Sequence, residues 1–468
     1  MSAALVWILF PFGVGVVLLP LLRYRRMVYI VAAAVTALLA ILAATVTINV
    51  PIELGIASLK IEPSFSILGR RLVLDQFDQT ILAVINLFAL FWLIGGLYSR
   101  VSSILAPAAL MIPALSIATL AVEPFLYSAL LIEGMVLVSI PLLSAPFSEP
   151  RPGVVRYLVF QTIGMPFLLL TGWLLGGMES APLDVDQTVQ ILIFLGVGFA
   201  FTLAIFPLYS WIPMLAEDEE PYLVGFILLV LPTSVMLFLL TFIDRYAWLR
   251  TSVNLPAFMQ YAGVLMVVTG GIGAGFQKNL ARIFGYAVIV ENGFAVLAMG
   301  LMTLRGNEIF ANMLLARMFS FGLWTIALEA IKRSRGSLLL ADVQGLARVK
   351  PMLAVSILIA QFTIGGLPLL AGFPLRIALI EELSMQSTTL AWLIIPGMAG
   401  IWAGGLYSLY VMLLKPEQSR KSLDVPRSLS VLMAVGIAFL VFLGLFPQVF
   451  SPVMVSLLNA FPRLLIIP

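Results

Sequence analysis

The feature that most limits the fold of this chain is a series of apolar stretches, each about 20 residues long. A helix needs about 20 mostly apolar residues to cross the hydrocarbon core of a bilayer. The 468 residues are 62% hydrophobic and 10% charged, whereas a soluble domain carries about 25% charged residues. These values predict an all-α integral membrane protein, and the short polar connections leave no room for a separate soluble domain.

Fourteen stretches satisfy this criterion, which predicts about 14 transmembrane helices. The predicted helices cover residues 4–22, 27–50, 78–98, 102–122, 124–145, 154–176, 188–214, 222–243, 257–276, 282–303, 309–331, 352–385, 390–414 and 429–448. The first has its basic residues after the apolar run, which is typical of a membrane helix and not of a cleaved signal peptide. Between the second and third helices, alternating residues near 54–60 and 68–74 predict a short hairpin outside the membrane.

The distribution of Lys and Arg predicts which side of the membrane each loop faces, because cytoplasmic loops carry an excess of these residues. If the basic cluster at 23–26 lies inside, 17 of the 26 basic residues share that side and seven lie opposite. This bias predicts a multi-pass protein with both termini on the extracytoplasmic side, and we expect it in a prokaryotic (inner) cell membrane.

Two of the predicted helices, the seventh and the twelfth, contain clustered Gly and Pro. FPLYSWIP carries Pro207 and Pro213, and GGLPLLAGFP carries Pro368 and Pro374. Proline interrupts a helix, and irregular backbone persists at membrane depth only inside protein or beside a water-filled cavity. Two broken helices about 160 residues apart favour a transporter built from repeats over the alternative that proline is simply common in membrane helices.

Composition also excludes several kinds of site. The chain has no Cys and no His, which removes thiolate metal sites, the commonest metal ligand and the ordinary near-neutral proton relay. We therefore expect no metal, no cofactor and no redox centre in this chain, so that any redox chemistry belongs to a partner. The net charge of +3 gives no reason to expect nucleic-acid binding.

Few ionisable residues fall deep within the predicted helices, where a charge costs roughly 2.5–3.5 kcal/mol on insertion scales. Glu133 is expected to take part in proton transfer, since a desolvated carboxyl can load and release a proton near neutral pH. The alternative is a neutral acid that is hydrogen-bonded to a neighbour. Glu291 and Arg317 lie on consecutive helices and are expected to form a buried pair, either as a clamp or as part of a relay. Arg376 follows the second break and is expected to donate to freed carbonyls or to hold positive charge beside a wet channel.

Two acidic features are expected at the inner ends of helices. Glu329 lies near Lys332 and Arg333, which predicts a salt bridge at a helix end. The segment LAEDEEPY (215–222) places four acids directly after the first broken helix. It predicts a solvated loop, and the alternative is a docking contact for a basic partner subunit.

Several segments, in order, resemble the antiporter-like subunits of respiratory complex I. The same family includes the large subunits of Mrp-type sodium/proton antiporters and of membrane-bound hydrogenases. The resemblance covers roughly residues 70–415. The segments are RRLVLDQFDQTILAVI, LYSALLIEGM with Glu133 on the family's helix-five Glu, IFPLYSWIPMLAEDEEP with Tyr209 in place of its His, FQKNLARIFGYAVIVENGF, and GGLPLLAGFPLR with Arg376 on its helix-twelve Lys or Glu.

The resemblance implies fourteen helices in which two inverted five-helix repeats each contain a broken helix. Residues 1–468 would form one membrane domain, with N-terminal helices at 1–122, repeats at 124–243 and 257–414, and a C-terminal helix and tail at 415–468. It also implies other membrane subunits as partners and proton transfer along a line of buried charges. The expected pathway residues are Glu133, Glu291, Arg317 and Arg376, with Thr202 and Tyr209 as relay residues.

The chain departs from the family pattern where the family carries lysine. The lysine that pairs with the helix-five Glu corresponds to Thr202, and the central lysine corresponds to Pro232. Glu291 stands on one family His, and Ala316 stands on the second, with Arg317 beside it. Coupled pumping by the family mechanism is therefore in question for the first half of the chain.

We expect an antiporter-like subunit of a multi-subunit energy-converting membrane complex of the complex I, hydrogenase or Mrp type. Its function would be proton or sodium translocation coupled to electron transfer, as a subunit of a translocating oxidoreductase (NADH/quinone or hydrogenase type). The first alternative is a non-conducting scaffold subunit of the same fold. The second is a stand-alone secondary transporter.

Overall fold

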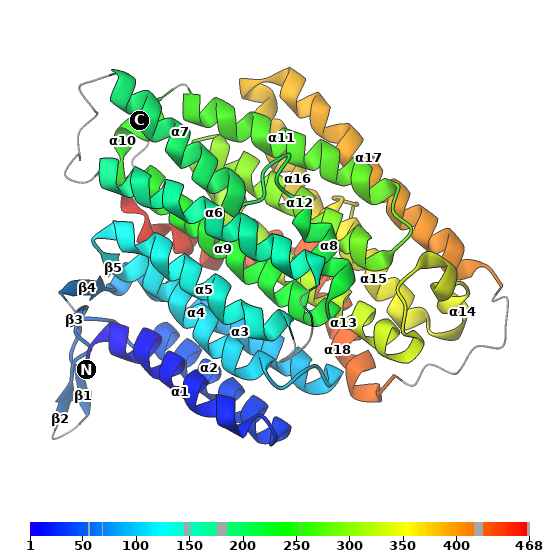
Figure 1. The fold of residues 1–468 in the computed structure, drawn as a ribbon, viewed down its shortest axis with the longest axis horizontal. Coiled ribbons are helices and arrows are strands. Elements are labelled where there is room, and N and C mark those ends of the chain that lie inside the picture. The colour runs from blue at the N-terminus through cyan, green and yellow to red at the C-terminus, as the bar shows by residue number, and fades with distance from the viewer. Residues whose placement is uncertain are drawn as a thin grey trace.

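The computed structural model describes residues 1–54, 57–67, 69–144, 149, 151–175, 185–252, 254–415 and 425–465. Within these residues the chain is almost entirely helical, and the long helices lie side by side in one bundle (Figure 1). The α-helices are Phe10–Leu18 (α1), Arg25–Thr45 (α2), Gln79–Ser99 (α3), Leu105–Ala121 (α4), Ser128–Leu143 (α5), Pro152–Leu174 (α6), Val185–Thr202 (α7), Trp211–Asp218 (α8), Pro221–Arg245 (α9), Ala247–Thr251 (α10), Asn254–Gly275 (α11), Leu280–Gly300 (α12), Leu304–Arg335 (α13), Leu346–Val349 (α14), Pro351–Ile364 (α15), Gly372–Gln386 (α16), Thr388–Leu413 (α17), Arg427–Leu445 (α18) and Ser451–Val455 (α19).

The predicted all-α membrane fold is confirmed, and each predicted range contains one or two of these helices. Among the described residues, ten helices are long and apolar enough to cross a membrane, or up to eleven if the bent pair at 340–364 is one span. This number is below fourteen because the first and fourth helices are short and the seventh and twelfth are split. The count of fourteen spans remains a prediction.

The segment between α2 and α3 forms strands, but not the single hairpin that the sequence predicts. Ile52–Leu54 (β1) pairs antiparallel with Ala57–Leu59 (β2), while Ser64–Ile67 (β3) pairs with Arg70–Val73 (β4). The second hairpin turns at Gly69, whose φ of +72° is a conformation that glycine adopts without steric cost. A two-residue strand, Val122–Glu123 (β5), adds to β4 and joins this hairpin to the end of α4.

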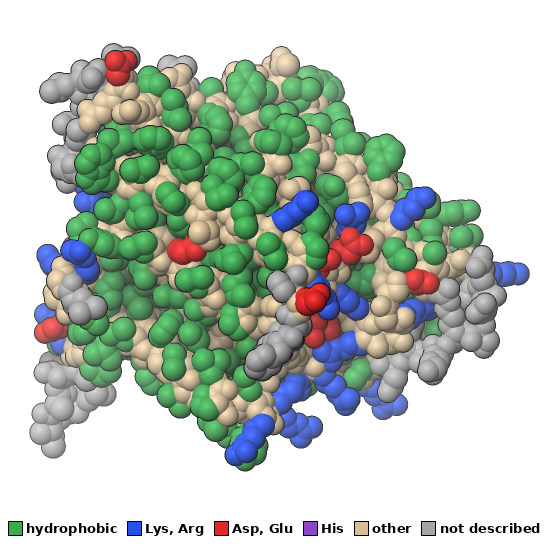
Figure 2. Space-filling model, in the orientation of Figure 1, with side chains coloured by type: hydrophobic (Ala, Val, Ile, Leu, Met, Phe, Trp, Pro, Cys, Tyr) green, Lys and Arg blue, Asp and Glu red, His purple; other side chains and the backbone are tan. Residues whose placement is uncertain are grey.

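The centre of the bundle consists of α9, α12 and α13. The most apolar window of α9 is completely buried, whereas only 28% of the corresponding window of α18 is buried. Hydrophobic side chains cover most of the face in Figure 2, and most Lys and Arg side chains gather toward the end away from the strands. The N-terminus lies at the strand end (Figure 1), and the last described residues pack against the end of α9 through Arg463 and Leu464. This separation of charge fits the predicted orientation, which remains a prediction because no membrane is part of the structure.

The two broken helices share part of their backbone geometry. The first break separates α7 from α8, and the second separates α15 from α16. Ala204 in the first break and Gly366 in the second both have a left-handed backbone, with φ of +56° and +69°. Four backbone N–H to C=O hydrogen bonds of the first break recur 162 positions later. In the first break, the N–H donors and C=O acceptors are Leu203 to Phe199, Ala204 to Phe201, Ile205 to Ala200 and Leu208 to Ile205. In the second break, they are Gly365 to Gln361, Gly366 to Thr363, Leu367 to Phe362 and Leu370 to Leu367.

Candidate functional site

A buried ion pair lies directly beside the second break. The guanidinium of Arg376 on α16 donates through Nη2 to Oε2 of Glu291 on α12, and both residues are only 2% exposed. The Nε of Arg376 donates to the carbonyl oxygen of Ile364, the last residue of α15, at 3.3 Å. The guanidinium carbon also lies 3.9 Å from the ring centroid of Phe294. Phe294 follows Glu291 by three positions and therefore shares its face of α12.

Gly366 makes room for this arginine. A Cβ at this position would lie 2.7 Å from the Cγ of Arg376, and the backbone φ of +69° disfavours a residue with a side chain. The break thus turns the chain and leaves the carbonyl of Ile364 without its helical donor. Of the two readings predicted for Arg376, the structure shows the donation to a freed carbonyl. The wet channel beside it stays a prediction.

Arg317 on α13 binds the neighbour of Glu291 and not Glu291 itself. Its Nη2 donates to Oδ1 of Asn292 at 2.6 Å and to the carbonyl oxygen of Leu228 on α9 at 3.1 Å. The expected Glu291–Arg317 pair is therefore wrong at the level of hydrogen bonds. Consecutive residues project about 100° apart on a helix, so that Glu291 faces α16 while Asn292 faces α13.

Together these four side chains form one polar line across α16, α12 and α13, with two cations and one carboxylate. Three of its atoms, Arg376 Nη1, Arg317 Nε and Asn292 Nδ2, have no hydrogen-bond partner among the described residues. A buried donor without a partner costs about 1–3 kcal/mol, and native structures keep few of them without a reason.

The two breaks differ in how their freed carbonyls are capped. Thr202 occupies the position in the first break that Ile364 occupies in the second, 162 residues later. The carbonyl oxygen of Thr202 accepts from the neutral amide of Gln161 at 3.1 Å, while that of Ile364 accepts from the charged Arg376. The structure thus places a cation at only one of these two equivalent carbonyls.

Glu133 lies apart from the polar line. Its Oε1 accepts from the hydroxyl of Thr162 on α6 at 2.8 Å, and its Oε2 is buried without a partner among the described residues. The hydroxyl of Thr202 donates to the carbonyl oxygen of Gly198 in its own helix, at 3.0 Å. No hydrogen bond in the described part of the chain joins Glu133 to Thr202. Tyr209 instead packs edge-to-face against Tyr286, with ring centroids 6.5 Å apart.

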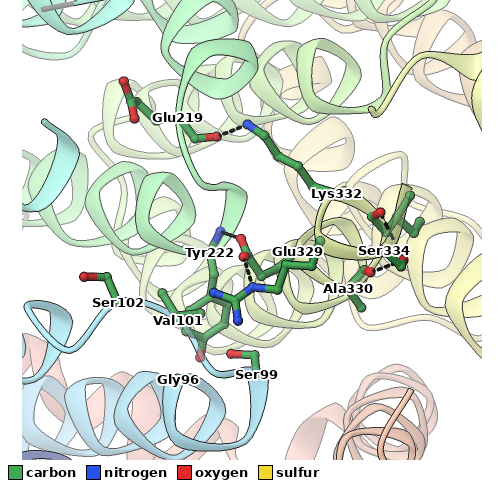
Figure 3. Close-up of polar contacts among 12 residues, drawn as sticks. Gly96, Ser99, Val101, Ser102, Glu219, Tyr222, Glu329, Ala330, Lys332 and Ser334 are labelled. Carbon is green, nitrogen blue, oxygen red and sulfur yellow. Dashed lines mark hydrogen bonds and ion pairs between the residues drawn. The ribbon is translucent and has the colours of Figure 1, made fainter. Parts of the chain in front are cut away.

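The acidic run after α8 is held by the chain's own residues. Arg282 pairs with Glu217 at 2.9 Å, the backbone N–H of Gly153 donates to Asp218 at 2.8 Å, and Arg151 lies 3.5 Å from Glu219. The Nζ of Lys332 donates to the carbonyl oxygen of Glu219 at 2.6 Å, which ties the run to α13 (Figure 3). The predicted solvated loop is therefore right only in part, because Glu217 and Asp218 belong to α8 and the acids are paired within the chain. The docking contact for a basic partner stays a prediction.

Glu329 forms the helix-end salt bridge that the sequence predicts. Its Oε1 accepts from Nε of Arg333, one turn later on α13, at 2.6 Å. Its Oε2 lies 3.5 Å from the backbone nitrogen of Tyr222, at the start of α9 (Figure 3). Burial and the nearby Glu329 both raise the pKa of Glu220, which lies just before α9.

Sequence reasoning missed two residues of these sites, Asn292 and Gln161. Both are polar side chains inside apolar helices, and this signal was available beside the charged residues. Phe294 belongs to the family-like segment FQKNLARIFGYAVIVENGF, but the sequence analysis assigned it no role. Among the described residues, no three Asp or Glu side chains lie close enough together to hold a metal ion.

Known proteins resemble this chain in sequence and in fold. "NADH-quinone oxidoreductase subunit N" of Moorella thermoacetica is 28% identical over 302 residues, which cover 62% of this chain and 60% of that protein. A chain of the Mrp complex from Dietzia sp. DQ12-45-1b superposes with a TM-score of 0.82 at 16% identity, covering 98% of this chain and 97% of that chain. A chain of respiratory complex I from Thermus thermophilus gives 0.72 at 21% identity, covering 95% and 98%.

The match to a protein family covers both breaks and the polar line. Residues 155–401 match the family described as "NADH:quinone oxidoreductase/Mrp antiporter, TM". This range holds 247 of the 468 residues, more than half of the chain. The chain therefore belongs to the NADH:quinone oxidoreductase/Mrp antiporter family of membrane proteins.

Proposed function

We propose that this chain is an antiporter-like subunit of a multi-subunit energy-converting membrane complex and takes part in proton or sodium translocation coupled to electron transfer. The observation that carries the proposal is the buried line of Arg376, Glu291, Asn292 and Arg317 beside a broken helix. Charges at this depth persist where they serve an ion path. The redox step belongs to partner subunits, since the chain has neither Cys nor His.

In this proposal the second half of the chain conducts. Arg376 and Arg317 remain charged and keep the electrostatic potential around the polar line positive. Glu291 is then the group of the line that takes up and releases a proton. The three unpaired donors would bind water molecules that complete the path. Sodium would require a set of oxygen ligands, which two arginines disfavour, so that the proton is the favoured ion.

The first half has a different role. Glu133 with Thr162 would form a separate acid site, and Thr202 and Tyr209 would act only through water, since neither hydroxyl reaches Glu133 by a hydrogen bond in the described structure. Gln161 caps the carbonyl of the first break with a neutral amide. We propose that this half mainly supports assembly and that Glu133 contributes less to translocation than Glu291.

The proposed topology has fourteen spans, with inverted repeats at 124–243 and 257–414, N-terminal helices at 1–122 and a tail at 415–468. It is supported by the backbone hydrogen bonds that recur in the two breaks. The termini would face the extracytoplasmic side of a prokaryotic membrane, which agrees with the basic residues at the opposite end of the bundle.

The test is ion translocation by the complex that co-purifies with the chain, reconstituted in vesicles. Glu291→Gln removes the proposed proton carrier and should lower the number of ions moved per electron at least about tenfold. Glu329→Gln is the matched control, because Glu329 is equally buried but lies at the end of the bundle. It should leave the ratio unchanged.

The alternatives give different results. A scaffold subunit predicts normal assembly and an unchanged ion-to-electron ratio in Glu291→Gln and Glu133→Gln. A stand-alone transporter predicts transport by the purified chain without partners. The list of co-purifying proteins decides among the complex I, hydrogenase and Mrp types of assembly.

A further inference from the structure

An arginine-lined pocket lies at the end of the bundle away from the polar line, between α2, α3 and the start of α18. Its volume is about 440 Å³. Three arginines line it together with Tyr98 and Ser428, and Ile30 and Leu97 form its apolar part. The arginines are Arg25, Arg26 and Arg100.

Arg25 organises the pocket. Its Nη2 donates to the carbonyl oxygens of Gly96 and Leu97 at 2.7 and 3.1 Å, and its Nε donates to that of Val101 at 3.1 Å. These carbonyls end α3, so that Arg25 caps the helix and fixes the wall of the pocket. Arg25 forms no ion pair with a carboxylate among the described residues, and its positive charge is therefore not neutralised.

Arg100 occupies a position where glycine would be expected. It ends α3 with a φ of +56°, in the left-handed region that costs an L residue about 1–2 kcal/mol. Both Arg100 and Arg26 are exposed. Glycine would end the helix at lower cost, whereas arginine at this position places its side chain in the wall of the pocket.

The pocket continues into apolar surface. Ile30, on its wall, is 58% exposed, and Val431, one turn after Ser428 on α18, is 63% exposed. Residues three apart share a helix face. Val431 therefore lies on the same face of α18 as Ser428 and adds apolar surface next to the pocket. A ligand that fits needs an anionic head for the arginines and a hydrocarbon body for the helix faces.

We propose that this pocket binds the phosphate headgroup of an anionic phospholipid, with its acyl chains along α2 and α18. Basic pockets between membrane helices hold such headgroups, and arginine pairs with phosphate oxygens through two parallel hydrogen bonds. Arg26 and Arg100 bind the phosphate, while Arg25 shapes the site. The proposal is independent of ion translocation, since it needs only the membrane-embedded fold.

The test is native mass spectrometry of the full chain, released from the assembly in which it purifies, with phosphatidylglycerol or phosphatidylcholine added in neutral detergent. The wild type should bind phosphatidylglycerol at least about tenfold more tightly, which corresponds to one charge-assisted hydrogen bond. Arg26→Gln and Arg100→Gly should each lose this preference. Arg100→Gly relieves the strained backbone, so that loss of binding there is not loss of folding.

Arg23→Gln is the matched control, because Arg23 lies in the same basic cluster over the ring of Tyr24 and does not line the pocket. Arg26→Lys keeps the charge and should retain most of the preference. Equal loss in Arg23→Gln would show a diffuse basic surface and overturn the pocket. Wild-type preference in both Arg26→Gln and Arg100→Gly would overturn it too. Displacement of phosphatidylglycerol by an equal concentration of inorganic phosphate would mean a free-phosphate site and overturn the lipid assignment.

Discussion

Removal of Glu291 should destabilise the protein far more than removal of Glu291 and Arg376 together. In Glu291→Met, Arg376 keeps its hydrogen bond to Ile364 and its contact with Phe294 but loses the carboxylate that it binds. An uncompensated buried charge costs about 3–5 kcal/mol. Arg376→Met leaves the carboxylate buried and should cost a similar amount. The double variant replaces both charges with apolar side chains of similar length and should fall within about 1 kcal/mol of the wild type.

The coupling free energy between the two sites is then about 5–10 kcal/mol, since each single change costs about 3–5 kcal/mol and the double change at most about 1 kcal/mol. An unfolding entropy of about 2.1 cal/mol/K per residue gives about 1 kcal/mol/K for a chain of this length. Each single substitution should therefore lower the melting temperature by about 3–5 °C, and the double substitution by about 1 °C or less.

The assay is thermal unfolding in detergent, followed by tryptophan fluorescence, for the wild type and the three variants. The exposed pair of Arg305 and Glu381, at 2.9 Å, is the matched control. Both of its side chains are 51% exposed, and such pairs couple by about 0.2–1 kcal/mol. Additive losses for Glu291 and Arg376, with coupling no larger than in the control pair, would refute the reasoning.

Three further perturbations test the surroundings of the site and the inner end of the bundle. Gly366→Ala should lower the melting temperature and displace the Arg376 side chain, because the new Cβ would lie 2.7 Å from its Cγ. An unchanged melting temperature would contradict this. Asn292→Ala should lower the free energy of unfolding by about 1.5–3 kcal/mol, because it removes a hydrogen bond to the charged Arg317. Asn292→Asp keeps an acceptor for Arg317 and should not lower it, and thermal unfolding measures both variants. Glu220 keeps its proton to higher pH when folded, because burial and Glu329 raise its pKa. Its stabilising contribution is therefore present below the unfolded pKa of about 4.3 and is lost as the pH rises through the folded pKa. Glu220→Gln should make the melting temperature depend less on pH in this range. An unchanged dependence would argue against the raised pKa of Glu220.

Much of the fold follows from local sequence. Apolar length predicts the helices, because a span must bury about 20 residues in hydrocarbon. Clustered Gly and Pro predict both breaks, because proline removes a helical hydrogen bond. The charged residues of the polar line were also identifiable, since each is isolated in an apolar stretch. The left-handed conformation that Ala204 and Gly366 share is less visible in the sequence, because the two positions do not share a residue type.

The pairing of charges was decided by the tertiary structure alone. Glu291 and Arg317 lie on consecutive helices, yet Glu291 binds Arg376, 85 positions away, since the rotation of α12 about its axis turns neighbouring residues to different partners. The acidic run at 217–220 reads as a solvated loop, but packing brings α6, α12 and α13 to its sides. Composition determines that such charges must be compensated, because a low-dielectric interior makes isolation costly. Which groups compensate these charges depends on how the helices are rotated and packed, and a local stretch of sequence determines neither.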